Sequence, residues 1–171
     1  MLTDFLEKWF GNQLYEMGEP SFSQLAKDKE NKHVRLLVVP TSTPSIALRI
    51  AELESAEPSL TCSTLDGLGG YDPGGLDQRE TYTLKKQNMT ALLEALESFD
   101  AWQGGFPPKR ETIYTDGTRV VLEMAQKSFF HVVSLQTCEL LPSTEALIQE
   151  FFSLAPEFDG YCLGCKSPWS R

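Results

Sequence analysis

Hydrophobic residues recur at helical spacing in three stretches of the chain, where they stand three or four positions apart as on one face of an amphipathic helix. Gly18 and Pro20 end the first pattern, and Pro156 ends the third. Ser143 is a suitable N-cap for the third helix. Between the first helix and the first strand, residues 19–32 are polar and predict a surface connection. The three predicted helices cover 2–17, 86–99 and 143–155.

Short β-rich runs fill the spaces between these helices. The runs at 33–39 and 46–51 flank a turn and predict a hairpin. Further strands are predicted at 60–65 and 79–84. The segment between them, Asp66–Gly75, contains five glycines and one proline, which exclude regular structure. It is therefore expected to form an elaborate hairpin tip or a bulged crossing.

A second group of β-rich runs spans 110–135. Asp116 and Gly117 separate its first two runs, and this dipeptide accepts the positive φ angles of a type I′ turn. A third run starts at Phe129 after a polar break. The stretch predicts an antiparallel meander with Asp116 and Gly117 at the tip of a tight hairpin.

The elements follow the order helix, strands, helix, strands, helix, with a tail at 157–171. Because the strands are grouped rather than alternating with helices, the order favours an α+β fold with an antiparallel sheet. The 171 residues contain no internal repeat or linker, so a single domain over 1–171 is expected. Within it, hairpins cover 33–84 and the meander covers 110–135.

The formal net charge is −9 and the isoelectric point is about 4.7. Such acidity disfavours binding to nucleic acid and to anionic lipid, and it favours encounter with a basic protein. The alternative is that the acidity only keeps the protein soluble. No apolar run reaches the length of a membrane span, and Asp4 and Glu7 stand where a signal peptide has basic residues. The expected location is the cytoplasm.

Acidic residues concentrate between Glu52 and Glu80, where seven carboxylates face one arginine and give a net charge of −6. This is two thirds of the net charge of the chain. Such clustering usually means only that an acidic face is exposed to water. The more specific explanation is that these residues form a binding surface for a cationic partner.

Cys162 and Cys165 form a C-x-x-C pair, which can supply half of a tetrahedral zinc site. A redox site would need this pair at a strand-to-helix junction, but it lies near the C-terminus. A cytoplasmic setting predicts reduced thiols and no structural disulfide. We expect no metal and no cofactor. The other half of a zinc site would have to come from His33, His131, Cys62 or Cys138. None of these residues forms a second close pair in the sequence.

Catalytic motifs are weak. The glycine-rich segment lacks the lysine and the spacing of phosphate-binding loops, and it lacks the D-x-D-x-D-G spacing of a calcium loop. Asp116, Glu123 and His131 lie on neighbouring predicted strands and would suit acid–base chemistry. However, each residue also has a structural explanation. Asp116 suits the predicted turn, and His131 would lie on one face of the predicted sheet.

The chain resembles a group of small, acidic bacterial cytoplasmic proteins, several of which act as immunity proteins against toxins encoded beside them. The resemblance covers roughly residues 33–155. It depends on a GGY..G hairpin within LDGLGGYDPGGL and on a DG....LE....(Y/F)H.V meander within DGTRVVLEMAQKSFFHVV. The chain departs from the pattern at Val120–Val121 and at Leu135–Cys138. Because the shared motifs are turn and core residues, the resemblance implies a fold and no catalytic residues.

The first functional hypothesis is therefore a non-enzymatic immunity protein, which occludes the basic active site of a cognate toxin such as a nuclease. Tyr71 at the loop tip would be an interface anchor. One alternative is a small metal-dependent hydrolase that uses Asp116, Glu123, His131 and the cysteines. Another is a regulatory or adaptor module with a peptide partner. The residues expected to bind the partner are Glu52, Glu54, Asp66, Tyr71, Asp72, Asp77 and Glu80.

Overall fold

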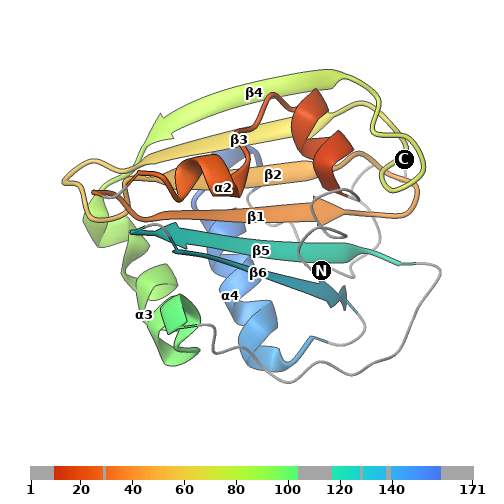
Figure 1. The fold of residues 1–171 in the computed structure, drawn as a ribbon. Helices are drawn as coiled ribbons and strands as arrows, with labels where there is room; N and C mark the ends of the chain where they lie inside the picture. The colour runs from red at the N-terminus through yellow and green to blue at the C-terminus, as the bar shows by residue number, and fades with distance from the viewer. Residues whose placement is uncertain (1–9, 29, 104–116, 128, 138–139, 159–171) are drawn as a thin grey trace.

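A computed structural model of the chain describes residues 10–28, 30–103, 117–127, 129–137 and 140–158. Six strands form one sheet in the order β4-β3-β2-β1-β5-β6, and every neighbouring pair is antiparallel. Helices cover both faces of this sheet (Figure 1). The predicted α+β class with an antiparallel sheet and about three helices is confirmed.

The strands are β1 His33–Val39, β2 Ile46–Ala51, β3 Ser59–Leu65, β4 Leu76–Thr83, β5 Arg119–Gln126 and β6 Phe129–Gln136. The α-helices include α2 Phe22–Leu25, α3 Thr90–Ser98 and α4 Pro142–Ser153. Residues 10–16 are also helical. Short 3-10 turns are η1 Lys86–Met89, η2 Ala101–Gln103 and η4 Pro156–Phe158.

One face of the sheet packs against α3 and α4, which Figure 1 shows below and behind the strands. Alternate residues of β1, beginning at Val34, point to this face, because successive side chains of a strand point to opposite sides. Leu92 and Leu96 of α3 and Phe151 and Phe152 of α4 cover them, all at most 1% exposed. This layer is the main apolar core.

The opposite face is covered by residues 10–27, here called the N-terminal layer, which Figure 1 shows in front of the strands. Phe10 and Met17 of this layer pack on Leu37 and Val39 of β1. Phe22 of α2 packs on β5. Every residue of β1 is therefore buried, on both faces. This burial explains why HVRLLVV reads as a nearly continuous apolar run.

The predicted helices are present, with changed ends. Residues 10–16 confirm the described part of the 2–17 helix. The 86–99 helix begins with a 3-10 turn, and α3 follows from Thr90. The N-cap at Ser143 was wrong: α4 begins at Pro142, whose fixed φ angle suits the first helical position, and Leu141 is the cap. The connection at 19–32 contains α2, which sequence analysis missed.

The meander was predicted correctly in part. Its second and third strands are β5 and β6, paired as an antiparallel hairpin. However, β5 pairs with β1 along its other edge, from Arg119 to Ala125. Because a strand has only two edges, no further strand can pair with β5, and the predicted hairpin across Asp116 and Gly117 was wrong. Gly117 does have a positive φ angle, of 124°. Residues 110–116 lie outside the described part of the chain.

Candidate functional site

The glycine-rich segment forms the tip of the β3–β4 hairpin, and the strand register shifts at Thr64 and Leu65, as a bulge does. Hydrogen bonds hold the loop from within. The Leu68 amide donates to the Asp72 carbonyl at 2.7 Å, and the Gly75 amide donates to Oδ1 of Asp66 at 2.7 Å. The Gly74 amide donates to Oδ1 of Asp72 at 3.0 Å. The loop therefore has a defined shape, which its own backbone and the carboxylates of Asp66 and Asp72 hold together.

Contacts with the rest of the molecule fix the same loop. The Gly70 amide donates to the Pro40 carbonyl at 2.9 Å, and the Gln13 side chain donates to the Gly69 carbonyl at 2.8 Å. Gly69 has a φ of 56°, and a Cβ placed there would overlap the Pro40 carbonyl oxygen. Glycine is required at this position both for its φ angle and for the close approach of the two backbones.

This anchored loop presents apolar side chains to solvent. Tyr71 is 74% exposed and Leu68 is 58% exposed, although the backbone around them is fixed. Leu76, the first residue of β4, is 46% exposed. Large exposed side chains on a rigid segment lose little conformational freedom on binding, so they are suited to anchoring a partner.

Carboxylates flank these side chains. Asp66 and Asp72 lie in the loop, and Asp77 and Glu80 follow on β4, an edge strand whose one neighbour among the described strands is β3. Asp77 shares a face with Arg79, whereas Glu80 points to the opposite face. Within the described residues, none of these four carboxylates forms an ion pair. We call Asp66, Tyr71, Asp72, Asp77 and Glu80 the acidic edge.

Glu52 and Glu54 are not part of the acidic edge. They lie in the β2–β3 turn, at the other end of the sheet in Figure 1. The length of β3, about 20 Å, separates this turn from the glycine-rich loop. Glu54 forms an ion pair with Lys32 at 2.7 Å, and the hydrogen bond from Lys32 is the main cause of its lowered pKa. The seven predicted partner-binding residues therefore fall into two groups.

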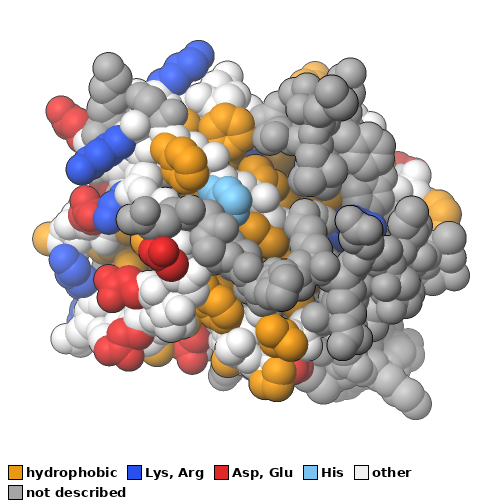
Figure 2. Space-filling model, turned by 60° about the horizontal axis from the view of Figure 1, so that its bottom comes forward, with side chains coloured by type: hydrophobic (Ala, Val, Ile, Leu, Met, Phe, Trp, Pro, Cys, Tyr) orange, Lys and Arg blue, Asp and Glu red, His pale blue; other side chains and the backbone are white. Residues whose placement is uncertain are grey.

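The other edge of the sheet has a different surface. Figure 2, which brings the lower side of Figure 1 forward, shows hydrophobic side chains near the middle of the view. Acidic and basic side chains are mixed at one side of it. Phe129, at the start of β6, is 44% exposed. Unlike β4, β6 has several half-buried or buried residues along its length.

Cys62 lies beside β4 on the face that carries Glu80. Burial raises the pKa of the Cys62 thiol, and the charges of Glu157 and Glu80 raise it further. The Tyr82 hydroxyl donates to Glu157 at 2.8 Å, and this bond is the main reason why the Tyr82 pKa rises to about 12. Cys62 is a free, buried thiol. It is therefore unsuited to nucleophilic chemistry.

The predicted acid–base constellation is not assembled. Glu123 of β5 pairs across the ladder with Val132, and His131 pairs with Met124. Residues paired across a ladder share a face, so Glu123 and His131 point to opposite faces of the sheet. The hypothesis of a joint acid–base site was wrong for these two residues. Asp116, the third residue of that group, lies outside the described residues, as do Cys138, Cys162 and Cys165 of the hydrolase hypothesis.

Sequence analysis missed a group of ionised side chains beneath the N-terminal layer. Glu19 accepts hydrogen bonds from Arg35 at 3.3 Å, from Arg49 at 2.7 Å and from Arg79 at 2.8 Å. Nε of Arg35 also donates to Glu123 at 2.6 Å. The side chains of Arg35 and Glu19 have no exposed surface. We call these five residues the buried charge cluster.

The electrostatics of this cluster favour the charged form of Glu19. Burial alone would raise the pKa of Glu19, because it removes the carboxylate from water. The charges of Arg49 and Arg35 and the hydrogen bonds from Arg49 and Arg79 outweigh burial, so the pKa is lowered. The sequence did carry a signal of the cluster, since Arg35 and Arg49 stand inside apolar strand runs.

No group of three or more histidine, cysteine, aspartate or glutamate side chains in the described ranges is arranged to hold a metal ion. Among the helices described, none is long and apolar enough to cross a membrane. Comparison with known proteins finds no protein-family model that matches the chain and no curated protein sequence that matches it. The resemblance to immunity-type proteins therefore stays a prediction.

Proposed function

We propose that this protein is a non-enzymatic binding protein that neutralises a cognate bacterial toxin by occluding its active site. The observation that carries the proposal is the acidic edge. It combines an anchored loop, an exposed tyrosine and four carboxylates that no cation of the described residues neutralises. Such a surface is complementary to a cationic cleft, which enzymes acting on anionic substrates such as nucleic acid require.

Tyr71 is the anchor in this proposal, because it offers a large amphipathic surface at low entropic cost. Asp72 stands next to it, and Asp77 and Glu80 extend the negative potential along β4. Carboxylates that have no ion-pair partner among the described residues would steer a basic partner and fix its orientation. Glu52 and Glu54 lie too far away to share one compact interface with Tyr71. The proposal therefore concerns the acidic edge alone, with the cytoplasm as its setting.

An adaptor that binds a basic peptide would use the same surface, and only the identity of the partner separates it from an immunity protein. The metal-dependent hydrolase has less support, because Glu123 and His131 lie on opposite faces and Glu123 is engaged by Arg35. The proposed partner therefore remains a toxin, and the surface that it presents to this protein is a cationic active site.

The direct test is co-production of this protein with a secreted toxin encoded beside it. Cells that make the wild-type protein should survive induction of the toxin. A variant with Tyr71→Ala and Asp77→Lys should protect poorly while remaining folded, because both side chains are exposed and neither is among the side chains that hold the loop by hydrogen bonds. A matched variant with Glu52→Lys and Glu54→Lys should protect as well as the wild type. Equal killing with and without the wild-type protein would exclude the immunity role.

A further inference from the structure

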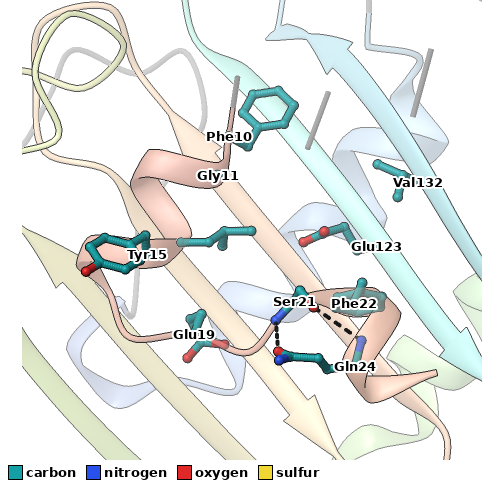
Figure 3. A pocket seen from close by; sticks show the side chains of 10 residues that line it. Phe10, Gly11, Tyr15, Glu19, Ser21, Phe22, Gln24, Glu123 and Val132 are labelled. Atoms are coloured by element: carbon teal, nitrogen blue, oxygen red, sulfur yellow. Dashed lines mark hydrogen bonds between the residues drawn. The ribbon is translucent and has the colours of Figure 1, made fainter. Parts of the chain in front are cut away.

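A pocket of about 360 Å³ lies between the N-terminal layer and the strands β5 and β6. Figure 3 shows the side chains that line it. Aromatic rings come from the N-terminal layer at Phe10, Tyr15 and Phe22, and Val132 comes from β6. An apolar pocket with a few placed polar groups is the usual form of a small-molecule site.

The charged side chains that line this pocket, among the described residues, are Glu19 and Glu123. The arginines that pair with them do not line it, and Arg35 has no exposed side-chain surface at all. A group that enters the pocket therefore meets carboxylates before it meets a guanidinium. Because the Coulomb energy falls with distance, the nearest charges decide which ligand is favoured, and these charges are negative.

One carboxylate oxygen in the pocket wall has no hydrogen-bond partner. Oε2 of Glu123 accepts from Nε of Arg35 at 2.6 Å, whereas Oε1 accepts no hydrogen bond from the described residues. Glu123 is only 6% exposed, but Oε1 is not one of the unpartnered polar atoms that lie completely buried. Since Glu123 lines the pocket, this oxygen keeps its contact with the open space there.

Glu19 does not offer a second acceptor of this kind. Its Oε1 accepts from Arg79, and its Oε2 accepts from Arg35 and Arg49. The Glu19 side chain also has no exposed surface. Oε1 of Glu123 is therefore the carboxylate oxygen that a ligand can reach, and a nearly buried acceptor gains most from a donor that replaces its lost water.

The surroundings of this oxygen favour a cationic donor. A hydrogen bond from an ammonium to a carboxylate is charge-assisted and roughly twice as strong as a neutral one. Aromatic rings also attract a cation through their negative faces. The Phe22 ring already lies 4.7 Å from the guanidinium carbon of Arg35, and the rings of Phe10 and Tyr15 line the same pocket.

We propose that this pocket binds a small primary amine, in its ammonium form, with an apolar or aromatic body. The ammonium would donate to Oε1 of Glu123, and the body would lie among Phe10, Leu14, Phe22 and Val132. The site is distinct from the acidic edge, so it does not depend on the proposed toxin partner.

Three probes of similar size and different charge test this assignment: benzylamine, benzyl alcohol and benzoate. Benzylamine carries an ammonium near neutral pH, as lysine does, whereas benzyl alcohol offers a neutral donor and benzoate an anionic acceptor. Each is titrated into the full-length protein, with the heat of binding and the thermal midpoint as readouts. Benzylamine should bind with a Kd of about 1 mM or tighter and raise the midpoint. Benzyl alcohol should bind at least about tenfold more weakly, and benzoate more weakly still.

Two variants locate the binding. Gly11 lines the pocket, and a Cβ placed there meets no atom within 4 Å, so Gly11→Leu adds a side chain without a clash. Val132→Phe fills the pocket from the wall that β6 provides. Asn12→Leu is the matched control, because Asn12 is an exposed neighbour that does not line the pocket. Denaturation curves without ligand confirm that each variant is folded.

Glu123→Gln tests the acceptor itself. It keeps the shape of the side chain but removes its charge, so benzylamine and benzyl alcohol should bind this variant nearly equally. Glu16→Gln, at an exposed position outside the pocket, should keep the wild-type preference for benzylamine. Because Glu123 also pairs with Arg35, its thermal midpoint without ligand is measured first. If Glu123→Gln does not fold, the probes and the two pocket variants decide the case.

The expected result is that Gly11→Leu and Val132→Phe each weaken benzylamine binding at least about tenfold, while Asn12→Leu binds like the wild type. Three results would overturn the proposal: no binding of benzylamine, equal binding of benzyl alcohol by the wild type, or benzylamine binding that neither pocket variant weakens. The last of these would mean that the amine binds to acidic residues elsewhere on the surface.

Discussion

The buried charge cluster and the acidic edge are both rich in ionised side chains, but they differ in where their charges are satisfied. In the cluster, Glu19 and Arg35 have no exposed side-chain surface, and arginines pair with carboxylates at 2.6–3.3 Å. In the acidic edge, Asp77 and Glu80 face solvent and have no ion-pair partner among the described residues. The first arrangement stabilises the fold, and the second leaves charge available for a partner.

Arg79 links the two regions. Its backbone belongs to the edge strand β4, but its guanidinium reaches Glu19 beneath the N-terminal layer. The one arginine of the acidic stretch is therefore used by the cluster. This arrangement leaves Asp77 and Glu80 as the charged side chains of β4 without an ion pair, although the strand also carries a positive residue.

The largest expected effect comes from removing Glu19. Glu19→Ala leaves three arginine side chains without their common acceptor, and losing one partner of a buried pair costs about 3–5 kcal/mol. Urea denaturation should show this loss in the free energy of unfolding. Glu16→Ala, at an exposed position in the same layer, should change it by less than about 0.5 kcal/mol. Similar small losses for both variants would contradict the structural role of the cluster.

Substitution in the glycine-rich loop should have a smaller but clear effect. Gly69→Ala places a Cβ against the Pro40 carbonyl at a positive φ angle, so we expect a loss of about 1–3 kcal/mol. Gly70→Ala is the matched control, since its Cβ would meet Pro40 at an ordinary 3.8 Å. Equal stabilities of the two variants would mean that the loop is not anchored as described.

The free energy of unfolding at acidic pH should depend on Glu19. Its pKa is lowered from 4.5 in the folded protein, so the stability that it contributes is present above 4.5 and is lost as pH falls through the lowered value. Glu19→Gln cannot titrate, and its stability should fall less steeply below about pH 5 than that of the wild type. Glu16→Gln should keep the wild-type slope. A wild-type slope in Glu19→Gln would contradict the assignment.

The smallest effect concerns Cys62. Because burial raises its pKa, the thiol should react with a disulfide reagent at about pH 8 only when the protein unfolds. A variant that carries serine at 138, 162 and 165 leaves Cys62 as the single thiol, so absorbance of the released thiolate reports on it alone. Fast labelling in native buffer would show that this part of the β3–β4 sheet opens readily.

Patterns of apolar spacing predicted the fold well where the burial of apolar side chains decides the structure. The stripe of leucines in α3 and the apolar runs of β1 and β2 each require burial, and the sheet and helices follow from it. The spacing did not show that β1 would be buried on both faces. That arrangement needs a second layer, and α2 in this layer is too short to produce a periodic signal, although the sequence does carry its capping box at Ser21 and Gln24.

The strand pairing of β5 and the grouping of the acids depend on long-range packing, and the sequence did not predict them. Asp116 and Gly117 have ideal turn chemistry, yet β1 occupies the edge of β5 that their hairpin would need. Glu54 and Asp72 belong to the same acidic stretch of sequence, but a whole strand separates them in space. In contrast, the exposure of Tyr71 follows from local glycine content, so it was predictable.

We propose that partner binding depends on the charges of the acidic edge and not on other acidic residues. The most direct measurement is the association rate with the toxin encoded beside this protein, at low and high salt, for two charge-reversed variants. Asp77→Lys with Glu80→Lys should slow association by at least about tenfold at low salt, with little change in dissociation or stability. Raising the salt concentration should shrink that difference. Glu52→Lys with Glu54→Lys should associate like the wild type, whereas equal slowing by both pairs would contradict the claim.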